Sequence, residues 1–376
     1  MKLGILCTMI NGFGRKGYYN SQEIGLGRVL AKKGHTVIIY KGVPQTELEE
    51  TVKIGEQEMV HYIPMKHLGA HGFVDCRYLE KNLDGLFCFG DQQIFLPHVY
   101  RWCVKNGICF VPYVGTAHSL YSNLKSRVMN ALFAAGTLRI YRKVPVAAKT
   151  ETARKELESL GVRKVLNAPV GLDTAVLKQD FRETDKEALR EKYGFSADDV
   201  ILCNVSRLSF EKRPLELVDL FSRIRGKKPF RLIIVGDGEE KEALKEKIRS
   251  YGLEKEVRLY EQVPYEQMWE IYRISDYYLN MNQGEIFGMA VMEAVYYGVS
   301  VVAADAPGPR ITLKGMKGHK ICASDKEMED WVLEPYPSEK DLKESAEKMA
   351  ESFTWDTCAN AFLRVIRGSK ERKRRK

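Results

Sequence analysis

Long apolar runs are missing from this sequence, and their absence argues against a membrane-spanning helix. No stretch reaches the roughly 18 consecutive apolar residues that a membrane-spanning helix requires. Residues 1–8 are followed by a glycine-containing segment and not by a small-residue cleavage site. We therefore expect a first β-strand there and no signal peptide. An integral helical membrane protein is not predicted.

Cysteine is sparse and scattered. The spacing of the cysteines is neither that of paired metal ligands nor that of a small disulfide-bonded domain. Several of them stand inside apolar runs, so we expect reduced, buried thiols in a cytoplasmic protein. The eight cysteines are Cys7, Cys76, Cys88, Cys103, Cys109, Cys203, Cys322 and Cys358.

Acidic residues are absent from the region between Gln92 and Thr150, in a chain whose net charge is +9. The sequence also ends on a basic segment, residues 370–376, which is equally consistent with a solvated tail. Two basic regions favour an anionic partner, and a membrane surface and a nucleic acid both qualify. We do not expect a nucleic acid, because zinc-finger spacing, RNA-recognition aromatics and helix-turn-helix punctuation are missing. The basic residues of the acid-free region are Arg101, Lys105, Lys125, Arg127, Arg139, Arg142, Lys143 and Lys149.

Several motifs of known catalytic and cofactor sites are also missing, which narrows the classes of reaction to consider. No Ser-His-Asp or Cys-His arrangement competes as a nucleophilic site, and nothing indicates a lysine that holds pyridoxal phosphate. Asp237-Gly238-Glu239 is the nearest approach to a metal-binding acidic triplet. Acids also commonly begin the helix that follows a strand, so we expect neither a metal nor a cofactor.

A regular alternation of strand, polar loop and helix is what the sequence does contain. The 376 residues suffice for two domains, each with its own core. The pattern of strand, polar loop and helix opens at residues 3–8 and restarts at 200–205, which predicts an α/β protein with two Rossmann-like domains and parallel sheets. We expect the domains to join near Asn167-Ala168-Pro169-Val170-Gly171, giving an N-terminal domain over 1–170 and a C-terminal domain over 171–353.

The strongest functional signal is a pair of carboxylates, Glu285 and Glu293. They flank a glycine-containing loop and the start of an apolar helix, which Gly298 ends before a buried strand at 300–304. Backbone N–H groups at a helix N-terminus favour a diphosphate. Were the whole run helical, its eight steps would span about 12 Å, roughly the distance from ribose to sugar in a nucleotide-diphosphate sugar.

This segment resembles the signature of glycosyltransferase family 4, whose members are retaining enzymes of GT-B fold. Three further segments are similar to that family: 204–214, 232–239 and 353–356. The resemblance covers nearly the whole chain and is strongest over 199–305. It implies two facing domains with a cleft between them, and a last helix over 354–369 that crosses back to the N-terminal domain before a basic tail over 370–376.

The resemblance also implies residue roles. Arg207 and Lys212 would bind the donor diphosphate, Glu293 the ribose, and Glu285 the donor sugar. Further donor-binding positions are Gly236, Ile286, Phe287, Gly288 and Met289. Retention implies that the leaving phosphate helps to deprotonate the acceptor, so no protein nucleophile is expected.

Two loops of the N-terminal half complete the expected site. His118 follows the strand 110–114, and the family carries a histidine in the equivalent loop, close to the donor sugar. A purely structural loop histidine is the alternative. Gly12 and Gly14 would let a glycine-rich loop approach the diphosphate through backbone N–H groups, although their spacing departs from the family's adjacent glycine pair.

The expected activity is transfer of a sugar from a UDP- or GDP-sugar to a saccharide or lipid-linked acceptor, in envelope or polysaccharide synthesis. A nucleotide-sugar epimerase or a phosphorylase of the same fold is an alternative. So is a non-catalytic scaffold that binds nucleotide-sugars at a membrane.

Residues 122–144 combine apolar and basic side chains, and we expect a helix that can lie on an anionic lipid surface. The tail from Lys370 would add to this binding. The alternative is that this helix packs inside the N-terminal domain. The apolar residues concerned are Leu124, Val128, Leu132, Phe133, Leu138, Ile140 and Tyr141.

Overall fold

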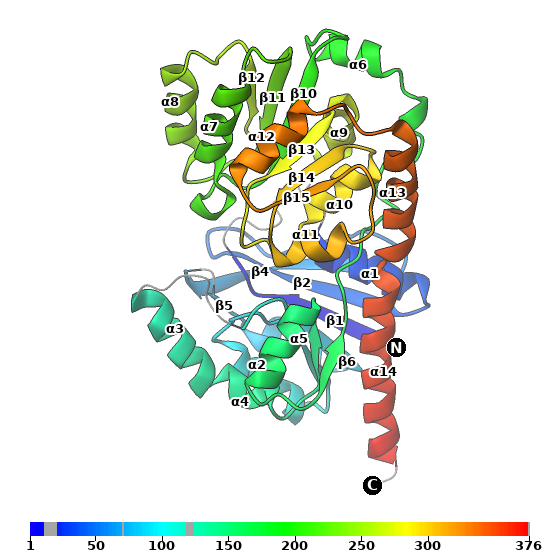
Figure 1. Ribbon diagram of the computed structural model, residues 1–376. Coiled ribbons are helices and arrows are strands. Elements are labelled where there is room, and N and C mark those ends of the chain that lie inside the picture. Colours follow the sequence, from blue (N-terminus) through cyan, green and yellow to red (C-terminus); the bar gives the residue numbers. More distant parts are fainter. Residues whose placement is uncertain (11–20, 70, 118–123, 375–376) are drawn as a thin grey trace. The chain divides into compact units, whose positions relative to one another are not determined.

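The computed structural model describes residues 1–10, 21–69, 71–117 and 124–374. The described chain forms two compact units (Figure 1). Of the described residues, unit 1 contains those up to Asp173 and those from Thr354 onward, and unit 2 contains residues 174–353. The expected boundary after Val170 lies close to the observed division after Asp173.

Unit 1 is built on a sheet with the strand order β3-β4-β2-β1-β6-β7-β8-β9, and β5 pairs with β4. Pairing is parallel except at β3 and β5, which run antiparallel to β4. Both faces of the parallel strands are covered, so strands such as β1 read as unbroken apolar runs. The strands are β1 (Lys2–Cys7), β2 (Thr36–Pro44), β3 (Glu50–Lys53), β4 (Glu58–Leu68), β5 (His71–Phe73), β6 (Gly85–Phe89), β7 (Cys109–Val114), β8 (Val146–Ala148) and β9 (Val165–Asn167).

The helices of unit 1 flank this sheet and enclose its main core. They are α1 (Gln22–Lys32), α2 (Leu96–Lys105), α3 (Leu124–Ala135), α4 (Thr137–Tyr141), α5 (Glu151–Ser159) and α14 (Trp355–Arg374), with a short 3-10 turn η1 (Cys76–Tyr78). All eight cysteines are free thiols, and none is exposed. Among the described helices, none is both long and apolar enough to cross a membrane.

Helix α14 returns the chain to unit 1, as expected from the family resemblance. Its buried face packs Phe362 against Phe87 of β6, with ring centroids 4.5 Å apart. Close approach is required where the chain leaves and re-enters the unit, because a Cβ on Gly171 would lie 2.3 Å from the Trp355 backbone nitrogen. The helix runs on to Arg374, so Lys370 is helical and pairs with Asp84. The separate tail expected over 370–376 is therefore wrong for residues 370–374.

Unit 2 holds a fully parallel sheet with the order β12-β11-β10-β13-β14-β15. Its strands are β10 (Val200–Val205), β11 (Phe230–Val235), β12 (Val257–Tyr260), β13 (Tyr277–Asn280), β14 (Ser300–Ala304) and β15 (Lys320–Cys322). Leu202, Ile234 and Val302 lie in its fully buried core. Neighbouring parallel strands end at the same edge of the sheet, where open α/β sheets bind their ligands.

Contacts between the main helices of unit 2 fall into three groups. Helix α7 packs against α8 and α12, whereas α10 packs against α13, and α6 against α9 (Figure 1). The helices are α6 (Lys186–Lys192), α7 (Pro214–Ile224), α8 (Lys241–Ser250), α9 (Met268–Ile274), α10 (Met289–Tyr296), α11 (Pro307–Thr312), α12 (Asp325–Leu333) and α13 (Glu339–Ser352). Short 3-10 turns are η2 (Phe181–Glu183), η3 (Phe210–Lys212) and η4 (Tyr265–Gln267).

The single helix expected over residues 122–144 is wrong. Gly136 separates α3 from α4, with backbone angles that leave the helical region (φ −110°, ψ −81°). Phe133 of α3 and Leu138, Ile140 and Tyr141 of α4 are buried in the core of unit 1. Those side chains pack inward, which is the alternative stated above for this segment. Leu124, Val128 and Leu132 of α3 remain exposed.

Candidate functional site

The candidate site of unit 2 begins where β10 and β11 end side by side. The Ser206 N–H donates to the Val235 carbonyl at 3.1 Å, and the Leu208 N–H to the Asp237 carbonyl at 3.0 Å. A Cβ on Gly236 would lie only 1.9 Å from the Ser206 carbonyl oxygen. Glycine at 236 therefore lets the two strand-end loops pack directly on each other.

The first of these loops carries the predicted cations. Arg207 forms an ion pair with Glu211 at 2.5 Å, and Lys212 places its Nζ 2.8 Å from the Glu285 carboxylate. Arg213 follows in a left-handed conformation (φ 55°) and pairs with Asp325 at 3.1 Å. The loop thus enters α7 with its cations held by carboxylates from three different segments.

Glu285 is the point at which two predicted motifs meet. Its carboxylate accepts from Lys212 Nζ, from Asn282 Nδ2 at 3.2 Å and from the Phe287 backbone N–H. Burial acts to raise the pKa of Glu285, but the Lys212 ammonium and these hydrogen bonds outweigh it, so the pKa is lowered. Glu285 is therefore an anion held in a largely buried place.

Helix α11 packs against the loop that carries Glu285 and fixes it through Gly308. The Gly308 N–H donates to the Glu285 carbonyl at 2.7 Å, and a Cβ on Gly308 would lie 2.8 Å from the Phe287 backbone. Phe287 is buried and meets Phe353 edge to face, with centroids 6.1 Å apart. Its side chain is a core element, so only its backbone remains for the predicted donor contact.

Gly288 ends the loop in a left-handed conformation (φ 86°), and α10 begins at Met289. The run from Glu285 to Glu293 is thus half loop and half helix, so the 12 Å estimate for a continuous helix does not apply. Ile286 and Met289 are half-buried beside this turn.

Glu293 lies on α10 and is 6% exposed. The Tyr272 hydroxyl donates to its Oε2 at 3.0 Å and the Tyr265 hydroxyl to its Oε1 at 3.3 Å. Burial, followed by the Glu293 charge, raises the pKa of Tyr272, which keeps this phenol a hydrogen-bond donor. Sequence analysis missed Tyr265, Tyr272 and also Asn282. Only the position of Asn282 within the signature segment could have indicated one of them.

The acidic triplet of residues 237–239 is engaged locally. Asp237 pairs with Lys241 at 3.0 Å and accepts the Gly238 N–H. Within the described ranges, no group of three His, Cys, Asp or Glu side chains is placed to hold a metal ion.

Three predicted residues cannot be placed. Gly12, Gly14 and His118 lie outside the described residues. The loop that precedes His118, residues 115–117, is described and lies at the carboxyl end of β7 in unit 1.

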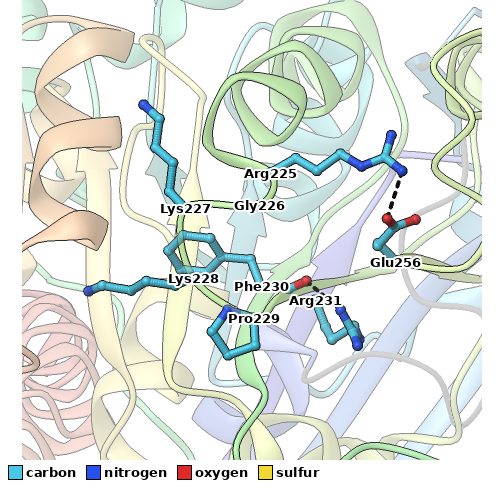
Figure 2. A pocket seen from close by; sticks show the side chains of 8 residues that line it. All are labelled: Arg225, Gly226, Lys227, Lys228, Pro229, Phe230, Arg231 and Glu256. Carbon is cyan, nitrogen blue, oxygen red and sulfur yellow. Dashed lines mark hydrogen bonds and ion pairs between the residues drawn. The ribbon is translucent and has the colours of Figure 1, made fainter.

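A pocket of about 530 Å³ in unit 2 is separate from these residues. Figure 2 shows it at Phe230, where β11 begins, and so at the opposite end of that strand from Gly236. Arg225 pairs there with Glu256 at 2.8 Å, and Arg231 with Asp199 at 3.2 Å. Two of the four basic residues that line the pocket, Arg225 and Arg231, thus have acidic partners, and the pocket shares no residue with the candidate site.

Residues 185–351 match the family model described as Glycosyl transferases group 1. The matched range contains the candidate residues of unit 2: Arg207, Lys212, Gly236, Glu285, Ile286, Phe287, Gly288, Met289 and Glu293. The family match and the geometry therefore point to the same segment.

The chain is also similar to individual proteins. It is 23% identical to a D-inositol 3-phosphate glycosyltransferase from Jonesia denitrificans, over 94% of this chain and 92% of that protein. Sucrose-phosphate synthase from Thermosynechococcus elongatus has a similar structure, with a TM-score of 0.76, 15% identity and 98% of each chain covered. Anabaena HepE (Alr3699), solved with UDP and glucose, gives a TM-score of 0.69 at 16% identity, covering 97% of this chain and 99% of that one.

The structural similarities show that the fold is the GT-B fold, which confirms the expected fold class. Together with the family match, they support a glycosyltransferase.

Proposed function

We propose that this protein is a retaining glycosyltransferase of family 4, which moves a sugar from a UDP- or GDP-sugar to a saccharide or lipid-linked acceptor. The observation that carries the proposal is the ion pair between Lys212 and Glu285. It joins two segments that are 73 residues apart in sequence, at the carboxyl edge of the unit 2 sheet. Those are the segments in which the resemblance puts the diphosphate-binding and sugar-binding residues.

Donor binding would exchange one anion for another. Arg207 and Lys212 are each held by a carboxylate, and a diphosphate is a stronger, multiply charged partner for a guanidinium fork and an ammonium. As Lys212 turns to the phosphate oxygens, the Glu285 carboxylate becomes available for the sugar hydroxyls. The fixed positive charge then stabilises the departing diphosphate.

Glu293 would hold the ribose. Tyr265 and Tyr272 orient its carboxylate, and a carboxylate has room to accept from hydroxyl groups as well. The crystal structure of HepE in complex with UDP and glucose favours UDP as the nucleotide. The name of one relative, D-inositol 3-phosphate glycosyltransferase, favours a phosphorylated polyol as the acceptor, and the name sucrose-phosphate synthase favours a phosphorylated saccharide as the product.

We further propose that transfer needs no divalent metal. Arg207, Lys212 and the loop before α10 supply positive charge and N–H groups where a metal would otherwise stabilise the leaving group. Retention of configuration follows the family resemblance, with the leaving phosphate deprotonating the acceptor.

A panel of UDP-, GDP- and ADP-sugars tests this function. Binding to the native state raises the melting temperature, so the true donor should give the largest shift. Product analysis by NMR, with and without EDTA, should then show free nucleoside diphosphate and a product of unchanged anomeric configuration. An epimerised sugar without acceptor, a product formed only with inorganic phosphate, or donor binding without turnover would each replace this proposal with one of the alternatives.

A membrane-bound acceptor remains part of the proposal through α3. Leu124, Val128 and Leu132 are spaced four residues apart on one helix face and are all exposed, with exposed Arg127 beside them. Such a face can lie on an anionic lipid surface at the cytoplasmic side. The protein should therefore co-sediment with vesicles of anionic lipid at low salt. Replacement of the three apolar residues by Ser should abolish this co-sedimentation. A protein that stays in the supernatant with anionic vesicles has a soluble acceptor.

A further inference from the structure

The loop after β7 in unit 1 is held by carboxylates from two other segments. Asp91 Oδ1 accepts the Gly115 N–H at 2.6 Å and lies 3.4 Å from the Thr116 nitrogen. Glu156 Oε2 accepts the Ala117 N–H at 3.2 Å. Consecutive N–H groups of a strand-end loop would otherwise form an anion-binding concavity. Here they are already bonded to anions, so this loop is fixed in place and is not a cradle for phosphate.

Asp91 itself adopts a left-handed backbone conformation (φ 21°). Among the described residues other than glycine, only Arg213 in the unit 2 loop shares a positive φ. Such conformations are energetically unfavourable and cluster at functional sites, where the surroundings enforce them. In the described part of the chain, these two positions both lie in loops that follow a strand, Asp91 after β6 and Arg213 between β10 and α7.

The surroundings of Asp91 enforce its conformation. The Gln93 N–H donates to the Gly90 carbonyl at 2.7 Å and closes a turn around Asp91. The Tyr141 hydroxyl donates to the Asp91 carbonyl at 3.4 Å, and a Cβ on Gly90 would lie 2.2 Å from that hydroxyl oxygen. Glycine at position 90 therefore allows the buried Tyr141 to approach the turn closely.

Lys149 balances the charge of Asp91. Its Nζ lies 3.5 Å from Asp91 Oδ2, 5.1 Å from the Phe89 ring centroid and 5.0 Å from that of Tyr113. These residues stand at the ends of β6, β7 and β8, neighbouring parallel strands of unit 1. An ammonium held over two aromatic faces and beside a carboxylate has little freedom to move. Lys149 thus pairs with the carboxylate of Asp91, and Asp91 in turn holds the loop.

We propose that Asp91 is a positioning residue for sugar transfer, acting through the loop Gly115–Ala117 that it holds. This inference rests on the proposed function, because the loop stands at the carboxyl end of β7, the edge at which open α/β sheets bind their ligands. Asp91 touches no substrate in this account. Its role is to set where the chain after β7 enters the carboxyl edge of the sheet.

Two substitutions of Asp91 distinguish a role in positioning the loop from a role in stability alone. Asp91→Asn keeps a carbonyl oxygen as acceptor and tolerates a left-handed backbone, whereas Asp91→Gly relieves the strain but removes the acceptor. The matched control is Asp185, whose Oδ1 also accepts two backbone N–H groups, at the start of α6 in unit 2. Asp185→Asn and Asp185→Gly repeat the chemistry away from the candidate site.

The experiment measures kcat, the KM for donor and acceptor, and the Kd for UDP in each variant. We expect Asp91→Gly to lose on the order of tenfold to hundredfold in kcat, as small misplacements of a reacting group do, with the Kd for UDP unchanged. Asp91→Asn should recover most of the loss. Both Asp185 variants should retain the parental kcat. Equal kcat in Asp91→Gly and the parent, or equal losses in Asp185→Gly, would overturn the proposal.

Amide hydrogen exchange of the peptide covering residues 113–117 gives a reading that does not depend on turnover. Asp91→Gly should exchange faster there, and Asp91→Asn close to the parental rate. If the protein transfers no sugar at all, the proposed function fails while this exchange result still decides whether Asp91 holds the loop. If transfer occurs but exchange in Asp91→Gly is unchanged, the positioning role alone fails.

Discussion

The strand-end loops of the two units use the same chemical groups in opposite ways. In unit 2, Lys212 projects from the loop and a carboxylate from another segment, Glu285, neutralises it. In unit 1, the carboxylates of Asp91 and Glu156 approach the loop and bind its backbone N–H groups. An ion pair between side chains can be exchanged for a phosphate, whereas a carboxylate bonded to the backbone fixes the chain. Under the proposed function, unit 2 therefore binds the anionic donor, and unit 1 holds a strand-end loop rigidly in position.

The largest expected effect comes from removing the exchangeable cation. Lys212→Met should lower kcat/KM on the order of 10²-fold, because a preorganised charge that stabilises the leaving group is lost. Lys192 forms an equally short ion pair with Glu270 at 2.6 Å on the surface of unit 2, so Lys192→Met is the control and should retain full activity. Steady-state kinetics with the identified donor makes the comparison. Parental kinetics in Lys212→Met would remove unit 2's role as the anion-binding unit.

The packing between the two loops of unit 2 predicts a loss of stability. Gly236→Ala would place a Cβ 1.9 Å from the Ser206 carbonyl, a backbone atom that cannot move aside cheaply. We expect about 1–3 kcal/mol of destabilisation in urea unfolding. Gly368 in α14 has open space around its Cβ position, so Gly368→Ala should be neutral or stabilising by about 0.5–1 kcal/mol. A Gly236→Ala protein as stable as the parent would show that the loops are not packed as described.

Two acids, one in each unit, have pKa values that the fold shifts in opposite directions. Burial raises the pKa of Glu58 on β4 to about 7, and the nearby Asp173 adds to this while Arg28 opposes it. The folded protein thus favours the protonated form. The stability gained this way is fully present below the ordinary pKa of 4.5 and is lost as the pH rises through about 7. Glu58→Gln should remove this dependence of the unfolding free energy on pH. It should also stabilise the protein at pH 8 by on the order of 1–3 kcal/mol.

Glu285 in unit 2 behaves in the reverse way. Its pKa is lowered despite burial, because of the Lys212 ammonium and the hydrogen bonds of the loop. The pair therefore contributes stability above the unfolded-state pKa and loses it as the pH falls through the folded-state pKa. Lys212→Met removes the ammonium that lowers the pKa of Glu285, while burial continues to raise it, so this pKa should rise. NMR titration of Glu285 in parent and variant measures this, and an unchanged titration would contradict it. The expected effect on stability is the smallest of those described, since one partly solvated pair is involved.

The fold could be predicted from the sequence for physical reasons, whereas the roles of the donor-site residues stay predictions. Buried parallel strands are apolar runs bounded by glycine or polar loops, so β10, β11 and β14 were recognisable without a structure. The signature segment also indicated that Glu285 and Glu293 flank a loop and a helix start.

Contacts between distant segments escaped prediction. Nothing local to Lys212 indicates that it meets Glu285, and nothing local to Asp91 indicates that it accepts from the Gly115 N–H. The expected helix over 122–144 failed because apolar content cannot distinguish side chains that pack inward, such as Phe133, from exposed ones such as Leu124. Tertiary packing, which alternation and spacing do not encode, decided these cases.

Calorimetric titration of nucleoside diphosphate into five proteins tests the central claim most directly: the parent, Lys212→Met, Glu285→Gln, Glu293→Gln and Asp91→Gly. If unit 2 binds the donor and unit 1 positions the chemistry, Lys212→Met and Glu293→Gln should weaken binding by on the order of tenfold or more, the loss of a charge-assisted contact. Glu285→Gln should bind nearly as the parent does and lose turnover instead, and Asp91→Gly should bind as the parent does. Parental affinity in both Lys212→Met and Glu293→Gln, or a loss of affinity confined to Asp91→Gly, would contradict the account.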